Sequence, residues 1–307
     1  MEIEDSLIFV HDATKCVEES DDPIRNVVYF SQEDKVSDDH KSQLCNGLVA
    51  LSVSIRGLSG KHPSYLASEK YLFALHNCDD VTVCFGVRKT LKPTKESIQS
   101  SMLLLLTMIK MRYSCIRRML EIWEKVGCQD NLLGIVGIAN QQRVLQLPFD
   151  IQMQCHLFVE HIIQHFRPLA SCLITSTCNH SIYTSFSSQL TRAITSLVHF
   201  MDHRNQKVRR NSSLLSSIPI FLSKDLEQKE FAVNNAYDQS VKNSAIFPRY
   251  QGEDELKYEY QVVMTVLSNS SCTLYIIGKD FYNITEHHLK EWEESLYNLG
   301  ALFTKFC

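Results

Sequence analysis

The chain has 307 residues, of which 44% are hydrophobic and 21% charged, and its formal net charge is -4. This length and hydrophobic content allow one large core or two to three small ones, which excludes a disordered tail. The near balance of charges excludes a strongly basic nucleic-acid-binding surface, so we expect no nucleic-acid partner.

Three features of the sequence predict a cytoplasmic protein. The longest apolar run, residues 102–109, is far shorter than the roughly 20 residues that cross a bilayer. The start of the chain carries Glu2, Glu4 and Asp5, where a secretory signal would carry positive charge. The 11 cysteines are scattered without a Cys-x-x-Cys pair, a pattern that in a reducing compartment indicates small buried hydrophobes.

The first block of the chain reads as alternating short strands and helices. Residues 7–10 and 27–30 are rich in aliphatic and aromatic side chains and are predicted strands. Ser42 can cap a helix, and Gly47 in that helix would allow close approach of another element. Apolar residues of this helix repeat at three- and four-residue steps: Leu44, Leu48, Leu51, Ile55 and Leu58.

A hairpin and two further helices complete this block. Residues 71–75 and 81–87 are predicted strands around the polar turn 76–80. Pro93 and Thr94 open a long helix that runs to Arg112, and a second helix covers 116–126. Strands and helices in this order make a complete small α/β layer unit.

The rest of the chain predicts two smaller blocks. Pro219 lies inside a predicted strand and argues for an edge position, because proline cannot donate a ladder hydrogen bond. The expected elements are a helix at 151–166, strands at 170–175, 181–186 and 218–222, a helix at 190–201, strands at 260–267 and 272–277, and a helix from 285.

We therefore predict a mixed α/β (α+β) fold of small, mostly antiparallel sheets packed with helices. The predicted boundaries are a first domain at 1–127, a second at 128–224, a polar linker at 225–255 and a third domain at 256–307. The second and third predicted domains have two or three strands and one long helix each, and domains that small are only marginally stable alone. Their exposed strand edges predict packing against each other or against a partner chain.

Motifs for covalent or metal chemistry are weak. The segment 57–62 superficially resembles a phosphate loop, but its first glycine is misplaced and His62 stands where Ser or Thr should hold magnesium. His156, His161 and His165 lie on one predicted helix, yet no carboxylate or cysteine cluster completes a metal-ligand set. We predict no catalytic, cofactor-binding or metal-binding residue and no enzymatic activity, with a hydrolase lacking local motifs as the open alternative.

The densest positive patch consists of Arg204, Lys207, Arg209 and Arg210. It is either a solvated loop or a contact for anionic lipid, worth about 1 kcal/mol per basic residue at a membrane surface.

Short motifs in all three blocks resemble one family. They are Leu7-Ile8-Phe9-Val10-His11-Asp12, Val28-Tyr29-Phe30-Ser31-Gln32, Leu44-Cys45-Asn46-Gly47, Leu169-Ala170-Ser171-Cys172-Leu173-Ile174, Ile218-Pro219-Ile220-Phe221-Leu222-Ser223-Lys224 and Thr273-Leu274-Tyr275. These motifs resemble the Hermansky-Pudlak syndrome protein 4 family, which belongs to the biogenesis of lysosome-related organelles complex 3 and to the three-longin-domain Rab exchange factors. The Ccz-type subunit of the related Mon–Ccz complex is similar in its first domain and stays open as an alternative.

The resemblance implies three longin domains and an obligate heterodimer with a second three-longin subunit, similar to Hermansky-Pudlak syndrome protein 1. The pair would be a guanine-nucleotide exchange factor for a Rab GTPase of lysosome-related organelles. Such a factor binds the nucleotide-free GTPase better and therefore weakens nucleotide binding by the same free energy. The chain would then lie on endosomal or lysosome-related membranes as a peripheral protein. A trafficking adaptor or tether, or a Rab effector without exchange activity, is the alternative.

In this family the first longin domains of the two subunits join side by side and form the GTPase platform. The matching residues here are Arg25, Asn26, Val27, Val28, Tyr29, Phe30, Leu44, Gly47, Leu48 and Leu51. Each apolar member of this set has an ordinary core position as its alternative, because a helix buries only one face.

Overall fold

The computed structural model describes residues 5–18, 20–127, 131–141, 147–166, 170–175, 181–184, 191–197, 214–223, 259–268, 272–278 and 286–303. The chain divides into two compact units. Unit 1 contains residues 1–109 and 115–140, and unit 2 contains residues 110–114 and 141–307.

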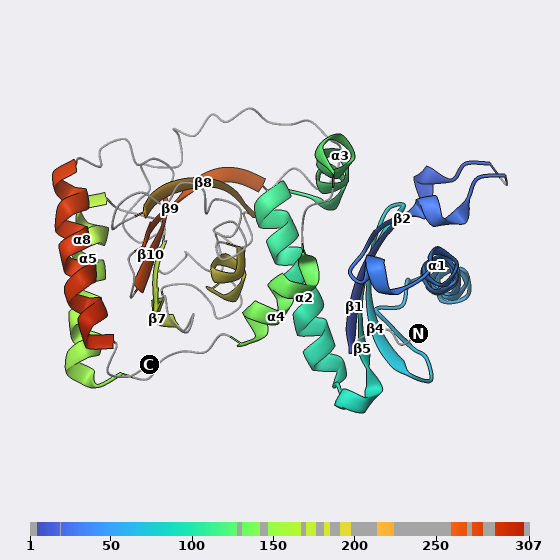
Figure 1. The fold of residues 1–307 in the computed structure, drawn as a ribbon, viewed down its shortest axis with the longest axis horizontal. Helices are drawn as coiled ribbons and strands as arrows, with labels where there is room; N and C mark the ends of the chain where they lie inside the picture. Colours follow the sequence, from blue (N-terminus) through green and yellow to red (C-terminus); the bar gives the residue numbers. More distant parts are fainter. Residues whose placement is uncertain are drawn as a thin grey trace. The chain divides into compact units, whose positions relative to one another are not determined.

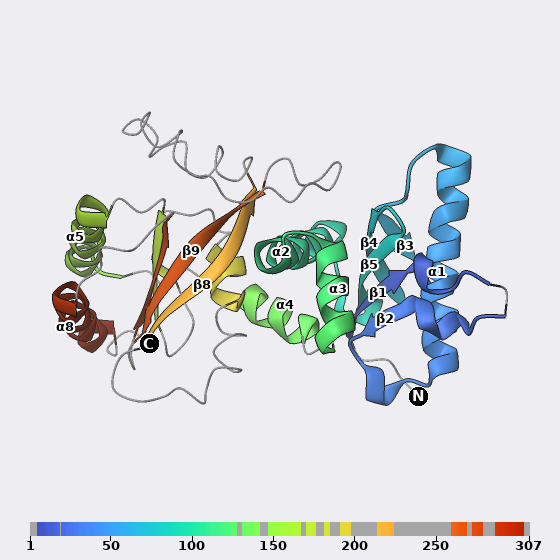
Figure 2. The same ribbon diagram turned by 90° about the horizontal axis from the view of Figure 1, so that it is seen from above.

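Unit 1 is built on one antiparallel sheet, sheet A, with the strand order β2-β1-β5-β4-β3. Helix α1 lies on one face of this sheet, and helices α2 and α3 lie on the other (Figures 1 and 2). The strands are β1 (Ser6–Asp12), β2 (Val27–Phe30), β3 (Tyr65–Ala67), β4 (Tyr71–Cys78) and β5 (Val81–Arg88). The helices are α1 (Asp38–Ser59), α2 (Lys95–Tyr113), α3 (Ile116–Val126) and α4 (Leu132–Gln141), with short 3-10 turns η1 (Ala13–Lys15), η2 (Pro23–Asn26), η3 (Glu33–Lys35) and η4 (Lys89–Leu91).

Strand β1 is buried on both faces of sheet A. Leu7 and Phe9 belong to the core under α1, and the alternate residues Ile8 and Val10 are equally inaccessible. A strand covered on both sides needs a continuous apolar run rather than alternation, which is what residues 7–10 provide. Opposite, a Cβ on Gly86 of β5 would lie 2.7 Å from the Phe73 ring, so only glycine fits there.

Helix α1 begins before the expected cap. Its N-cap is Ser37, and Asp38 and Asp39 fill the first turn, where carboxylates favour the positive end of the helix dipole. The prediction of Ser42 as the cap is therefore wrong. The helix ends at Gly60, whose left-handed backbone (φ 74°) lets its N–H bond the Arg56 carbonyl.

The predicted leucine stripe of α1 winds away from the core. Cys45 and Ser52 are fully buried, whereas Leu51 is 48% exposed and Leu58 91% exposed. Leu44, Leu51 and Leu58 follow a spacing of seven residues, and a straight helix rotates such a row by about 20° per repeat. The first leucine of the row therefore packs against the core while the last lies in solvent.

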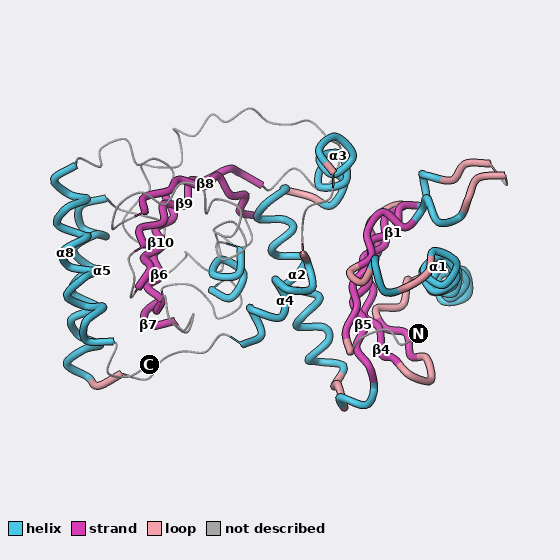
Figure 3. The backbone as a smooth tube through the Cα atoms, viewed as in Figure 1, coloured by secondary structure: helices cyan, strands magenta, loops and turns pink. Residues whose placement is uncertain are grey.

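Unit 2 is built on a second antiparallel sheet, sheet B, with the order β7-β6-β10-β9-β8. Helices α5 and α8 lie side by side on one face, where Ile151, Cys155, Leu274, Ile276 and Trp292 share one core (Figure 3). The strands are β6 (Ala170–Thr175), β7 (Ser181–Thr184), β8 (Leu214–Ser223), β9 (Glu259–Ser268) and β10 (Cys272–Gly278). The helices are α5 (Phe149–Phe166), a helix at 191–197 and α8 (Glu286–Phe303).

The two predicted C-terminal domains share this one sheet. Strands β9 and β10, expected in a separate third domain, lie between β6 and β8 of the expected second domain. The boundaries 128–224 and 256–307 therefore differ from the two units that the structure forms. Each block alone would leave open strand edges, and pairing between them closes those edges with main-chain hydrogen bonds. The edge position predicted from Pro219 is confirmed, because β8 pairs with β9 alone among the described strands.

The two units repeat one strand connectivity. Numbered within its own unit, each sheet has the order 2-1-5-4-3, all antiparallel. In each unit a helix follows the second strand, α1 in unit 1 and the helix 191–197 in unit 2, and another follows the fifth strand.

The predicted linker 225–255 and the basic patch Arg204, Lys207, Arg209 and Arg210 lie outside the described residues. Within the part of the chain that the structure describes, none of the helices has the length and apolar character that crossing a bilayer requires.

Candidate partner-binding surface

Strand β2 forms one edge of sheet A, next to β1. Phe30 pairs with Phe9 and Tyr29 with Val10, but His11 pairs with Val27, so Val28 is an extra, bulged residue. The bulge puts Val27 on the same side as Phe30, and both pack toward the core under α1. Edge strands with unpaired main-chain groups are common sites for an added strand from a partner.

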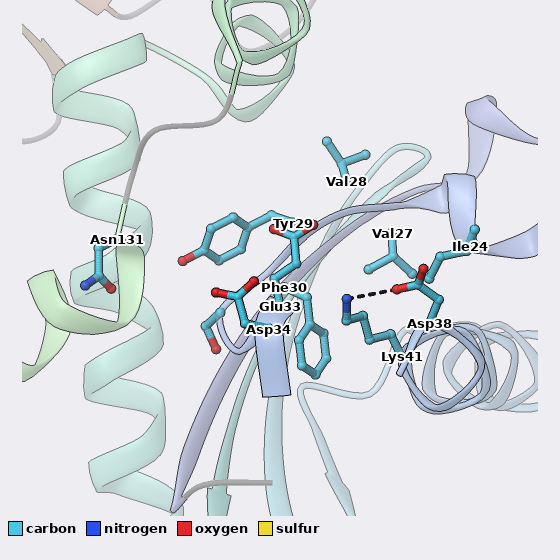
Figure 4. Close-up of a pocket in the computed structure, with 11 residues that line it drawn as sticks. Ile24, Val27, Val28, Tyr29, Phe30, Glu33, Asp34, Asp38, Lys41 and Asn131 are labelled. Carbon is cyan, nitrogen blue, oxygen red and sulfur yellow. Dashed lines mark hydrogen bonds and ion pairs between the residues drawn. The ribbon is translucent and has the colours of Figure 1, made fainter. Parts of the chain in front are cut away.

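An open groove of about 420 Å³ runs along β2 and the segment that leads into α1. Its lining includes the edge strand β2, the next residue Ser31, and Asn131, which immediately precedes α4 (Figure 4). Three carboxylates, Glu33, Asp34 and Asp38, line the groove together with one ammonium group, Lys41. Lys41 Nζ lies 2.9 Å from Asp38 Oδ1, so this pair neutralises itself and the remaining charge of the groove is negative. A partner surface with positive charge fits it best.

Tyr29 is held from the other face of the sheet. Its ring centroid lies 5.6 Å from that of Trp123 on α3, and its hydroxyl oxygen accepts a hydrogen bond from the Leu132 N–H at 3.2 Å. This bond satisfies one of the unpaired N–H groups at the start of α4. Tyr29 therefore anchors α3 and α4 to the edge strand.

Replacing Tyr29 with phenylalanine should destabilise unit 1 by about 1 kcal/mol, because the buried Leu132 N–H loses its acceptor. Chemical denaturation followed by Trp123 fluorescence measures the effect. Tyr65→Phe is the control, since the Tyr65 hydroxyl makes exposed hydrogen bonds to Lys95 and Gln99 and should cost less. Equal costs for the two variants would contradict an anchoring role for Tyr29.

The turn before β2 is ordered by two carboxylates. Asp21 accepts hydrogen bonds from the N–H groups of Glu18 and Val17, which lower the pKa of its carboxyl, and it pairs with exposed Arg25 at 3.1 Å. Asp22 caps η2 by accepting from the Ile24 N–H. Arg25 is thus accessible but already paired within the turn.

The predicted interface residues fall into two groups. Val27, Phe30, Leu44 and Leu48 pack in or against the core under α1, and Tyr29 packs on the opposite face. Arg25, Gly47 and Leu51 are exposed, and Asn26 and Val28 are half-buried.

Residues outside the prediction extend this exposed surface. Gly47, Leu51, Ser54 and Leu58 recur at four-, three- and four-residue steps, and we call them the outer stripe of α1. A Cβ on Gly47 would meet nothing within 4 Å. The drift of heptad-spaced leucines was the signal for Leu58, whereas the groove residues Glu33, Asp34 and Asn131 gave no sequence signal.

Of the three histidines singled out in the sequence, the structure describes the side chains of His156 and His161, whereas that of His165 lies outside the described residues. His161 Nε2 lies 3.4 Å from Glu291 Oε1, between α5 and α8. Among the described residues no group of three or more metal-ligating side chains converges.

Comparison with known proteins adds no family. No model of a protein family matches the chain, and no curated protein matches it.

Proposed function

We propose that this chain is a subunit of a heterodimeric guanine-nucleotide exchange factor for a Rab GTPase that acts in vesicle trafficking and the biogenesis of lysosome-related organelles. The observation that carries the proposal is the repeated connectivity of sheets A and B. The resemblance to longin-domain subunits implies three small antiparallel sheets packed with helices, and the described residues form two such sheets. The second sheet is completed by β9 and β10.

The surface of unit 1 supports the same proposal. An exchange factor changes no covalent bond and needs only a surface that binds the nucleotide-free GTPase better than the loaded one. The edge strand β2, its negatively charged groove and the outer stripe offer main-chain, electrostatic and apolar contacts for partner chains. Of the residues first considered, we assign partner contact to Arg25, Asn26, Val28, Gly47 and Leu51, and core packing to the others.

The direct test is release of fluorescent GDP from a panel of Rab GTPases by the chain co-purified with a second subunit of the Hermansky-Pudlak syndrome protein 1 type. Faster release from one Rab supports the proposal. Stable Rab binding without faster release would instead identify an adaptor, tether or effector. Preference for a late-endosomal Rab would favour a Ccz-type subunit.

The variant Leu51→Arg should weaken assembly with the partner subunit at least about tenfold, because a charge would have to be buried at an apolar contact. Pull-down of the second subunit and the GDP-release assay both measure it. Val126→Arg is the matched control, since Val126 is 63% exposed at the end of α3, on the other face of sheet A. Loss of assembly in both variants, or in neither, would exclude the outer stripe as the contact.

A further inference from the structure

One side chain, Asn46 on α1, joins three segments of unit 1. Its Oδ1 lies 2.9 Å from His11 Nε2 on β1, and its Nδ2 donates to the Pro23 carbonyl at 3.2 Å and to Ser42 Oγ at 3.0 Å. Strand β1, helix α1 and the turn η2 that leads into β2 are therefore connected through one amide.

The direction of these bonds fixes the form of His11. Because Asn46 Oδ1 can only accept, His11 must donate from Nε2, and the neutral ring then carries no proton on Nδ1. His11 is 3% exposed, and Nδ1 has no hydrogen-bond partner among the residues that the structure describes. A second proton would place a full charge in a buried position and an N–H on Nδ1, which has no hydrogen-bond partner among the described residues.

We propose that His11, Asn46 and the Pro23 carbonyl form a clamp that holds the turn 22–26 on α1, and that protonation of His11 opens it. In the open state the ring reaches water and Asn46 releases the Pro23 carbonyl. Neutral His11 is the closed state of the clamp.

The surroundings of His11 agree with this direction. Burial lowers its pKa most, while the Asn46 hydrogen bond and the nearby Asp12 carboxylate raise it by less. Strands β2 and β5 place the uncharged Val27 and Thr82 opposite His11. The elements around His11 also carry these titratable or charged residues: Tyr29 on β2, Cys84 and Arg88 on β5, Asp22 and Arg25 in the η2 turn, and Asp38, Asp39, His40, Lys41, Cys45 and Arg56 on α1.

The sign of the pH dependence follows from the lowered pKa. The open, hydrated ring titrates near the ordinary value of 6.5, and the closed ring titrates below it. Protons therefore bind the open state first, so the clamp is closed above pH 6.5 and opens as the pH falls below it. One pH unit below 6.5, the population of the open state rises up to about tenfold.

Amide hydrogen exchange on the whole chain at pH 7.5 and 5.5, corrected for intrinsic rates, tests the clamp. The reporters are the N–H groups of Ile24, Arg25 and Val27, each hydrogen-bonded inside the turn. Their exchange should rise up to about tenfold at the lower pH, while amides of the β4–β5 ladder keep their rates. Equal acceleration of the β4–β5 amides would show global loosening and overturn the proposal.

Three variants sharpen the test. His11→Gln keeps an N–H donor for Asn46 but does not titrate, so the pH effect on the turn should vanish. Asn46→Ala removes the connection, so the turn should exchange fast at both pH values. His40→Gln is the control, because His40 is exposed and bonds Ser37, and its pH effect should equal that of the unmodified chain.

Two further results would overturn the clamp. One is an unchanged pH effect in His11→Gln. The other is slower exchange of the turn at low pH, which would mean that protonated His11 gains an acceptor. Asn26 Oδ1 is one candidate, because it is also buried without a partner among the described residues. The turn carries Arg25 and Asn26, so any effect on partner binding rests on the proposed function. The exchange experiment uses the chain alone and stands if that function fails.

Discussion

Replacing Leu7 with alanine is expected to destabilise unit 1 by about 2–5 kcal/mol, because Leu7 is fully buried in the core between sheet A and α1. Leu58→Ala makes the same chemical change in the same unit. Leu58 is 91% exposed, so its removal should change the stability by no more than about 0.5 kcal/mol.

The two tryptophans let this comparison be made on unit 1 alone. Trp123 belongs to unit 1 and Trp292 to unit 2, and both are buried. In a Trp292→Phe background, fluorescence during denaturation follows only Trp123. A cost for Leu7→Ala as small as that for Leu58→Ala would mean that the core under α1 is not formed as described.

The elements that could be predicted from sequence are those with a local signal. The bounds of β2, α3 and β6 agree with prediction, because each is a run of apolar or amphipathic residues with a clear stop on both sides. The hairpin of β4 and β5 was predicted as well, although β4 runs further than expected, to Cys78, next to a tight turn at Asp79 and Asp80, and β5 ends one residue later than expected, at Arg88.

Two elements had no usable signal. Strand β3 has three residues, Tyr65–Ala67, too few to show a period, and it exists because it pairs with β4. Helix α4 contains Gly134 and Gly137, which lower helix propensity, and it is supported by tertiary contacts such as the bond from the Leu132 N–H to Tyr29. Strand β3 depends on the neighbouring strand β4, and helix α4 depends on Tyr29, which is distant in sequence.

The domain boundaries differed for a similar reason. Strand pairing between β6 and β10 joins residues about a hundred positions apart, and periodicity does not report which strands become neighbours. We predicted that the two small C-terminal blocks, with their open strand edges, pack against each other or against a partner chain. In the structure their strands pair within one sheet.

At the candidate surface, the sequence could identify the strand and the helix but not which face of the helix is exposed. The stripe of α1 was read as one face, yet the helix buries Cys45 and Ser52 and exposes Gly47 and Leu51. A buried serine and an exposed leucine reverse the usual preference, so no hydrophobicity rule could place them.

In the folded chain, the alkylation rates of exposed and buried cysteines should differ by several orders of magnitude. Burial raises the pKa of the Cys45 and Cys155 thiols from the ordinary 9.0 to about 12. Burial also raises the pKa of the Cys84 thiol well above 9.0. The thiolate is the reactive form, so at pH 8 a thiol of pKa about 12 has about 1,000-fold less of it than one of pKa 9.0.

Cys16 is the reference thiol, half-exposed in the turn before η2. Brief treatment with iodoacetamide, followed by mass spectrometry of the peptides, should modify Cys16 and spare Cys45, Cys84 and Cys155. In denaturant all four should react at similar rates, because the differences in pKa and access arise from folding. Cys45 and Cys84 report the core of unit 1, and Cys155 reports that of unit 2. Fast native labelling of Cys155 alone would therefore contradict the packing of α5 on sheet B while leaving unit 1 intact.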